Sequence, residues 1–209
     1  MRSTFSKFVV SLLILAACSP AEAIDSTTTS TSTTTTLATT TSSVGTTTTE
    51  ATTLSPINGL PVADPALLNR RLLAVKIDNH PNARPQSGIN HADAVFEIRV
   101  EGISRFLTMW MQSDAEFLGP MRSGRPTDST LLTALNKPTF AISGAQGWVQ
   151  EMIRSKDINL LTETTPAAFR VPFRRAPHNL YTTTAGLRAD ADARDYEDLP
   201  PTGPIWEFG

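Results

Sequence analysis

The hydrophobic pattern after residue 55 predicts a buried strand followed by a hairpin. Residues 72–78 are apolar and β-branched with a polar exit, which is typical of a buried strand. Residues 94–100 alternate between apolar and polar, Gly102 turns the chain, and residues 103–111 alternate again. The two alternating runs therefore predict an antiparallel hairpin. Its polar face is expected to carry Glu97, Glu101 and Arg105.

Helical and extended patterns alternate further along the chain. We expect helices at 127–135, 145–155 and about 182–196, and strands at 139–143 and 158–161. Thr127 is placed to cap the first helix, and the last helix is polar. In the second helix, Trp148, Met152 and Ile153 have helical spacing, which indicates a stripe facing the core. This order predicts an α/β fold (α+β), a mixed sheet with an antiparallel hairpin, covered by helices.

The first 18 residues have the pattern of an export signal. Arg2 and Lys7 precede an apolar run at residues 8–17, which is too short to span a bilayer. The run ends in Leu-Ala-Ala-Cys18, which resembles the bacterial lipobox, where the cysteine thiol receives a diacylglyceryl group. We therefore predict a lipoprotein signal peptide at 1–18 and a membrane anchor through lipid on Cys18. The alternatives are a signal cleaved without lipidation and an uncleaved anchor.

A threonine-rich segment follows the cysteine. From Ser26 to Thr53, 22 of 28 residues are Ser or Thr, and no Lys or Arg occurs between Lys7 and Arg70. Such a segment buries too little apolar surface to fold, so we predict a disordered tether at 19–55 that is a candidate for O-glycosylation. It would span roughly 35 Å as a coil and about 120 Å when stretched. It is either a stalk across part of a cell wall or a spacer that only aids solubility. Residues 56–209 remain for one domain.

Charge and cysteine content narrow the classes of partner. The chain has 18 basic and 20 acidic residues, a formal net charge of −2, and few of these charges precede residue 56. A nearly neutral domain argues against a nucleic-acid partner. Cys18 is the single cysteine and lies in the leader, so no disulfide forms within this chain.

Four segments of the folded part carry a family resemblance. They are Asn58-Gly-Leu-Pro61, residues 74–88 (Ala-Val-Lys-Ile-Asp-Asn through Arg-Pro-Gln-Ser-Gly), Gly119-Pro-Met-Arg-Ser-Gly-Arg-Pro126 and Arg175-Ala-Pro-His-Asn-Leu-Tyr-Thr182. In order and spacing they resemble the YerB-like family of bacterial lipoproteins, whose N-terminal domain has no assigned function. The resemblance implies a surface lipoprotein and no established activity. Members of the family continue into a second, β-rich domain, so residues 56–209 are expected to be a YerB-like N-terminal domain, truncated before it.

Polar residues gather where the predicted strands end and in the Gly/Pro loops. The expected ligand-binding residues are Lys76, Asp78, Asn79, Arg84, Glu101, Arg105, Arg122, Ser123, Arg125, Arg174, His178 and Asn179, with Arg175 beside them. Arginines in rigid loops can bind phosphate or carboxylate through two hydrogen bonds, and ligands of α/β sheets bind beyond the strand ends. The alternative is structural: Arg122 or Arg174 pairs with Glu97, Glu101 or Asp78 and ties a loop to the sheet.

Three functional hypotheses follow. The first is a non-enzymatic module of the cell envelope that binds an anionic glycan, a peptide or a protein in an arginine-rich cleft. The second is an envelope hydrolase that uses His178 with Asp78 or Glu101, and Ser123 as nucleophile. The third is a structural partner of the second domain.

We expect neither a cofactor nor a metal. The phosphate-binding loop that ends in Gly-Lys-Ser/Thr is missing. The possible metal ligands His80, His91, Asp93 and His178 include no second dense pair, so the signal for a metal site is weak.

Overall fold

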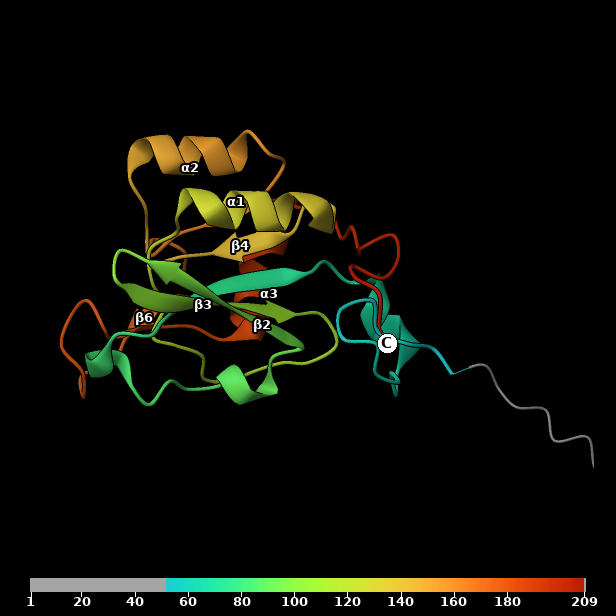
Figure 1. Ribbon diagram of the computed structural model, residues 1–209, viewed down its shortest axis with the longest axis horizontal. Coiled ribbons are helices and arrows are strands. Elements are labelled where there is room, and N and C mark those ends of the chain that lie inside the picture. Colours follow the sequence, from blue (N-terminus) through green and yellow to red (C-terminus); the bar gives the residue numbers. More distant parts are fainter. Residues whose placement is uncertain (1–51, 209) are drawn as a thin grey trace, which may run out of the picture. The chain divides into compact units, whose positions relative to one another are not determined.

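The structure is a computed structural model that describes residues 52–208 (Figure 1). The predicted signal peptide, Cys18 and residues 19–51 of the predicted tether lie outside the described residues. Among residues 52–208, none of the helices combines the length and apolar character needed to cross a membrane.

The centre of the domain is a mixed sheet of five strands. The strands are β1 (Leu73–Asp78), β2 (Ala94–Val100), β3 (Ile103–Trp110), β4 (Thr139–Ala141) and β5 (Asn159–Leu161). They lie in the order β2-β3-β1-β4-β5. Strands β2 and β3 form the predicted antiparallel hairpin, and β1 pairs in parallel with β4, which pairs in parallel with β5. The predicted fold class is confirmed, and the carboxyl ends of the three parallel strands share one edge.

Helices cover both faces of this sheet. Figure 1 shows α1 (Pro126–Leu132) and α2 (Gly147–Arg154) on one side of the sheet and α3 (Thr184–Asp192) on the other. Buried side chains of α1 and α2 pack against one face of β1, β3, β4 and β5. Leu187 of α3 packs against the opposite face with Val75 and Trp110. A small sheet of β6 (Phe169–Arg170) and β7 (Leu180–Tyr181) and four short 3-10 helices complete the described part. These helices are Pro65–Asn69, Pro81–Ala83, Ile89–His91 and Thr133–Leu135.

Two helix starts differ from the sequence prediction. Helix α1 is capped by Arg125 rather than Thr127, because Pro126 suits the first helical position and the Asp128 carboxylate accepts the Arg125 backbone N–H at 2.8 Å. Helix α3 begins at Thr184 after the cap Thr183 and ends at Asp192, so it is shorter than expected.

Two predicted side-chain orientations are wrong. Trp148 does not face the core: its residue is 55% exposed, whereas Ile153 of the same predicted stripe is buried as expected, together with Val149. Trp148 and Val149 are adjacent, so a small rotation of the helix exchanges which of them faces the core. Arg105 does not share a face with Glu97, because Arg105 pairs across the strands with Ile98 and Asp78, whereas Glu97 pairs with Phe106.

Candidate functional site

A loop lies between the carboxyl ends of β1 and β4 and separates them. Residues 119–125 run beside the end of β1, where the Arg122 N–H donates to the Lys76 carbonyl at 2.8 Å. On its other side, the same loop accepts the Ser143 N–H at the Arg122 carbonyl (3.1 Å) and donates the Gly124 N–H to the Gly144 carbonyl (3.0 Å). The loop therefore takes the place of the β1–β4 ladder at this edge, which is the edge where α/β sheets bind ligands.

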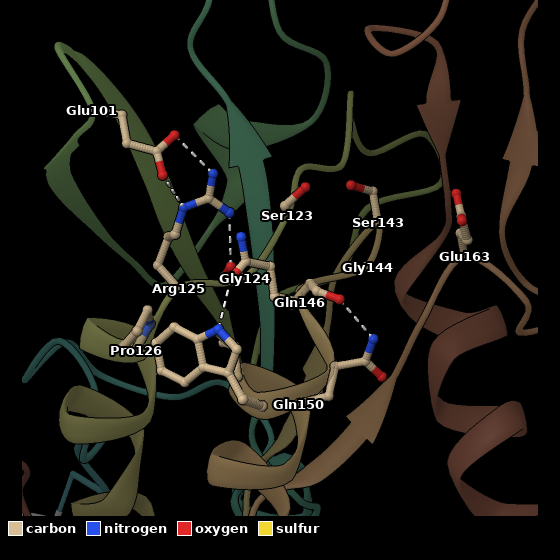
Figure 2. A pocket seen from close by; sticks show the side chains of 13 residues that line it. Glu101, Ser123, Gly124, Arg125, Pro126, Ser143, Gly144, Gln146, Gln150 and Glu163 are labelled. Carbon is tan, nitrogen blue, oxygen red and sulfur yellow. Dashed lines mark hydrogen bonds and ion pairs between the residues drawn. The ribbon is translucent and has the colours of Figure 1, made fainter.

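A cleft of about 710 Å³ opens beyond these strand ends. Its walls come from the ends of the hairpin, β4 and β5, the loop at 119–125 and the first turns of α1 and α2. The lining residues are Glu101, Ser123, Gly124, Arg125, Pro126, Ser143, Gly144, Ala145, Gln146, Trp148, Val149, Gln150 and Glu163. Figure 2 shows the Ser123 and Ser143 hydroxyls pointing toward each other, with the Glu101–Arg125 pair on one side and Glu163 on the other. The cleft is thus mainly polar.

Three arginines gather beside the cleft. The Arg125 guanidinium makes two hydrogen bonds of 3.0 Å to the Glu101 carboxylate. Arg105 is 3% exposed and reaches only the Ser123 carbonyl at 3.4 Å and Glu101 at 3.7 Å. The Arg122 Nε lies 3.4 Å from the Asp78 carboxylate. Neither the Arg105 Nε nor the Arg122 Nε has a hydrogen-bond partner within residues 52–208. Burial, and then the charges of Arg125 and Arg122, lower the pKa of Arg105.

Glu101 supplies most of the opposing charge. It precedes Gly102 in the hairpin turn, and both residues have left-handed backbone angles, with φ of 52° and 87°. The hydrogen bonds from Arg125 and its positive charge hold the pKa of the Glu101 carboxyl below its ordinary value. Glu101 is exposed, so an incoming anion can compete with its carboxylate for Arg125.

A second polar group lies around Asp78. The His178 Nδ1 is 2.7 Å from the buried Asp78 carboxylate, and the His80 ring stacks on His178 with 4.6 Å between centroids. His178 lines a separate hollow of about 430 Å³ with residues from 173–176 and Asn82. The structure thus brings His178 to a carboxylate, whereas Ser123 lines the cleft and makes no hydrogen bond to His178. Glu101 is engaged by Arg125 instead.

Of the twelve expected ligand-binding residues, three line the cleft, namely Glu101, Ser123 and Arg125, and five of the other nine bind other parts of the protein. Lys76 is fully buried, 2.6 Å from Asp128, and burial lowers its pKa against the opposing charge of Asp128. The Asn79 amide N–H donates to Ser104 at 2.6 Å and its carbonyl accepts from Arg84 at 3.0 Å. Arg174 donates to the carbonyls of Asn82 (3.1 Å) and Pro85 (2.6 Å), and Asn179 accepts from Arg170 at 2.7 Å. Their donors and acceptors hold loops in place.

The possible metal ligands do not gather into a larger set. The Asp93 carboxylate accepts the backbone N–H of Gln112 at 2.9 Å and so closes a turn, and His91 lies near Asn90. In the part of the chain that the structure describes, no group of three or more His, Cys, Asp or Glu side chains could hold a metal ion.

Comparison with known proteins identifies the family. Residues 57–197 match the family model described as "Protein of unknown function (DUF3048) N-terminal domain". The chain belongs to this family. It is 32% identical over 155 residues to "Putative lipoprotein YerB" of Bacillus subtilis (strain 168), covering 72% of this chain and 46% of that protein. It also resembles a crystal structure of YerB protein from Bacillus subtilis, with a TM-score of 0.67 and 31% identity over 73% of this chain and 53% of the other. The chain therefore spans about half the length of the relatives it matches.

Three of the four segments that carry the family resemblance meet in space. The Asp78 N–H donates to the Pro120 carbonyl at 2.9 Å, and the Met121 N–H donates to the Leu180 carbonyl at 2.6 Å. The segment around Asp78, the loop at 119–126 and the segment at 175–182 thus form one scaffold at the end of β1. This scaffold fixes the backbone of Arg122 and Arg125 beside the cleft.

Sequence reasoning missed ten of the thirteen lining residues. Ser143 and Gly144 follow β4 and Glu163 follows β5, whereas Gln146, Trp148 and Gln150 belong to the start of α2. The rule that ligands bind beyond strand ends, applied to β4 and β5 as well as to β1, would have indicated Ser143 and Glu163. For Trp148 the helical pattern pointed the wrong way.

Proposed function

We propose that this chain is a membrane-anchored, extracytoplasmic lipoprotein whose domain binds an anionic ligand in the cleft and is not an enzyme. The observation that carries the proposal is Arg105, a guanidinium almost wholly removed from water with an Nε that has no partner in residues 52–208. Buried charges are ordinarily paired and hydrogen-bonded, and an incompletely paired one is costly. An anion bound beside it at Arg125, which lines the cleft, would offset the positive charge of this group.

The local charge balance supports an anionic ligand. Within residues 52–208, Arg105, Arg122 and Arg125 form ion pairs with two carboxylates, Asp78 and Glu101, which leaves a formal excess of one positive charge in this group (3 − 2). Glu163, on the other wall, is paired with Arg170. The Lys76–Asp128 pair beneath them is neutral as a unit. Guanidinium groups present paired N–H donors that match phosphate and carboxylate oxygens. A phosphate or carboxylate is therefore the chemistry that the site fits.

The anchor rests on Cys18 and on the name of the relative. The cysteine ends a short apolar leader, and the Bacillus subtilis relative is named a lipoprotein. Replacing Cys18 by Ser should move the protein from the membrane fraction to the soluble fraction, measured by immunoblotting after ultracentrifugation. Unchanged membrane association in the variant would refute lipid anchoring.

Calorimetric titration with inorganic phosphate tests the cleft. We expect the wild-type chain to bind, and Arg122→Ala with Arg125→Ala to weaken binding at least about tenfold, because charge-assisted hydrogen bonds contribute most to such affinity. Arg99→Ala is the matched control, because Arg99 is exposed on β2 and lines no part of the cleft. An equal loss in the control, or no binding by the wild type, would refute the proposal.

The Asp78–His178 contact favours hydrolysis as a second candidate. A buried carboxylate 2.7 Å from Nδ1 orients the imidazole and leaves Nε2 able to act as a general base toward water. Hydrolysis of p-nitrophenyl acetate by the wild type and by His178→Gln is the simplest measurement. Equal rates in the two proteins would remove this candidate.

A further inference from the structure

We propose that the ligand of the cleft is a sugar that carries an anionic group, phosphate or carboxylate, with its ring against Trp148. This inference rests on the proposed anion site and adds the chemistry of the rest of the ligand.

Trp148 is large, apolar and held at the edge of the cleft. It is 55% exposed in the first turn of α2, while Val149 and Ile153 of the same helix anchor that turn in the core. The indole N–H donates to the Gln146 side-chain carbonyl at 2.6 Å, which fixes the orientation of the ring (Figure 2). An exposed aromatic ring that is held still beside a cavity offers a flat apolar surface at little cost in conformational entropy.

Polar groups without partners surround that surface. Neither the Ser123 nor the Ser143 hydroxyl makes a hydrogen bond in the described part of the chain, and the Gln146 amide nitrogen is equally free. One Glu163 oxygen binds Arg170 at 3.0 Å, and the other is free within residues 52–208. Hydroxyls both donate and accept, amide nitrogens donate and carboxylates accept. A ligand with several hydroxyl groups can pair with all of these, whereas a simple anion can accept from the hydroxyls and the amide but has no group to donate to the Glu163 carboxylate.

The charged, hydroxyl and aromatic groups lie in different parts of one cavity. The Arg125–Glu101 ion pair lies on one side and the two serine hydroxyls lie in the middle (Figure 2). The Trp148 ring belongs to the first turn of α2, which forms another wall. Gln150 is engaged at both ends, by the Ala145 carbonyl and by Arg154, and so supports the wall. A volume of about 710 Å³ admits a sugar ring with its substituents. The geometry thus fits an anionic group at the arginines and a sugar ring at the indole.

The test compares sugars with their anionic groups alone. The probes are glucose 6-phosphate, compared with inorganic phosphate, and glucuronate, compared with acetate. Each is titrated calorimetrically into the full chain. We expect at least one of the sugars to bind at least about tenfold more tightly than its matched anion. Trp148→Ala should abolish this gain, and Trp148→Phe should retain part of it. Phe173→Ala is the control, because Phe173 is 66% exposed and lies outside the cleft.

The outcomes separate the two proposals. If phosphate binds but neither sugar exceeds its matched anion, the sugar is wrong and the anion site stands. If adenosine monophosphate binds more tightly than glucose 6-phosphate and this advantage is lost in Trp148→Ala, the indole stacks on a nucleobase and the proposed sugar ligand is again wrong. If inorganic phosphate does not bind, the proposed function itself fails.

Discussion

Replacing Asp128 by Asn should leave the buried positive charge of Lys76 without its ion-pair partner. Lys76 and Asp128 both have fully buried side chains, and their charged atoms are 2.6 Å apart. The other Asp128 oxygen accepts the Arg125 backbone N–H at 2.8 Å, which starts α1 and positions Arg125 beside the cleft. Asparagine keeps the size but only one of the two acceptors. The change therefore removes the negative charge together with one of the two hydrogen bonds.

The expected loss in the free energy of unfolding is about 3–5 kcal/mol, because removal of one partner leaves an uncompensated buried ion. The pH dependence gives a sharper signature. Burial lowers the pKa of Lys76 and Asp128 opposes that shift, so the variant should lower the pKa further. Between the lowered pKa and about 10.5, the unfolded chain binds the extra proton. The stability of the variant should then rise by about 1.4 kcal/mol per pH unit.

Urea unfolding at pH 7 and pH 9, followed by tryptophan fluorescence, measures both effects. The matched control is Asp157→Asn, which changes an exposed aspartate that has no ion pair in residues 52–208. The double variant with Lys76→Met should recover at least half of the lost stability and lose the added pH dependence. A loss below about 1 kcal/mol in Asp128→Asn, or a double variant no more stable than the single one, would refute the reasoning.

Three further predictions concern the cleft and the packing around it. Glu101→Gln should raise phosphate affinity about three- to tenfold in calorimetric titration, because Glu101 then no longer competes for Arg125 as a carboxylate; a weaker affinity would contradict this. Gly88→Ala should destabilise the fold by about 1–3 kcal/mol in urea, because Gly88 has a φ of 79° and a Cβ there would lie 2.6 Å from the Phe117 carbonyl oxygen. Gly203→Ala, where the space is open, is its control. Ile153→Ala should cost about 2–5 kcal/mol through the cavity left beneath α2, and a change below about 1 kcal/mol would contradict the assigned core.

A continuous apolar run made β1 predictable from sequence, and strong local periodicity did the same for the β2–β3 hairpin. Seven alternating residues on each side of Gly102 define both the strands and their register. The periodicity of α2 was real but ambiguous: the predicted stripe of Trp148, Met152 and Ile153 contains Ile153 correctly, but Val149 precedes Ile153 by the same four residues by which Trp148 precedes Met152. The apolar pattern cannot distinguish two stripes that lie one residue apart. The two-residue strands β6 and β7 carry no period at all, and tertiary contacts define them.

Only the part of the candidate site that lies at the end of β1 could be predicted from the sequence. Asp78 and the Gly/Pro loop gave Ser123, Arg122 and Arg125, because a polar exit from a buried strand marks the edge of the sheet. Lys76 was grouped with them wrongly as a cleft-lining side chain, since its partner Asp128 lies 52 residues further on. A strand pattern tells which face a residue occupies but not which later helix covers that face.

The arginines show why residue type alone could not separate structural from ligand-binding roles. Arg174 and Arg105 both occupy regions that the sequence marks as polar. The Arg174 guanidinium donates to backbone carbonyls of the loop at 82–85, so it needs no further partner to be stable. Arg105 is more deeply buried and has an Nε without an acceptor in the described residues. The difference lies in the number of donors left unsatisfied after folding, which depends on contacts between distant segments. An anion bound beside Arg122 and Arg125 should stabilise the domain by an amount that rises with the logarithm of its concentration relative to Kd, and thermal unfolding with phosphate present should reveal this in the wild type and not in Arg122→Ala with Arg125→Ala.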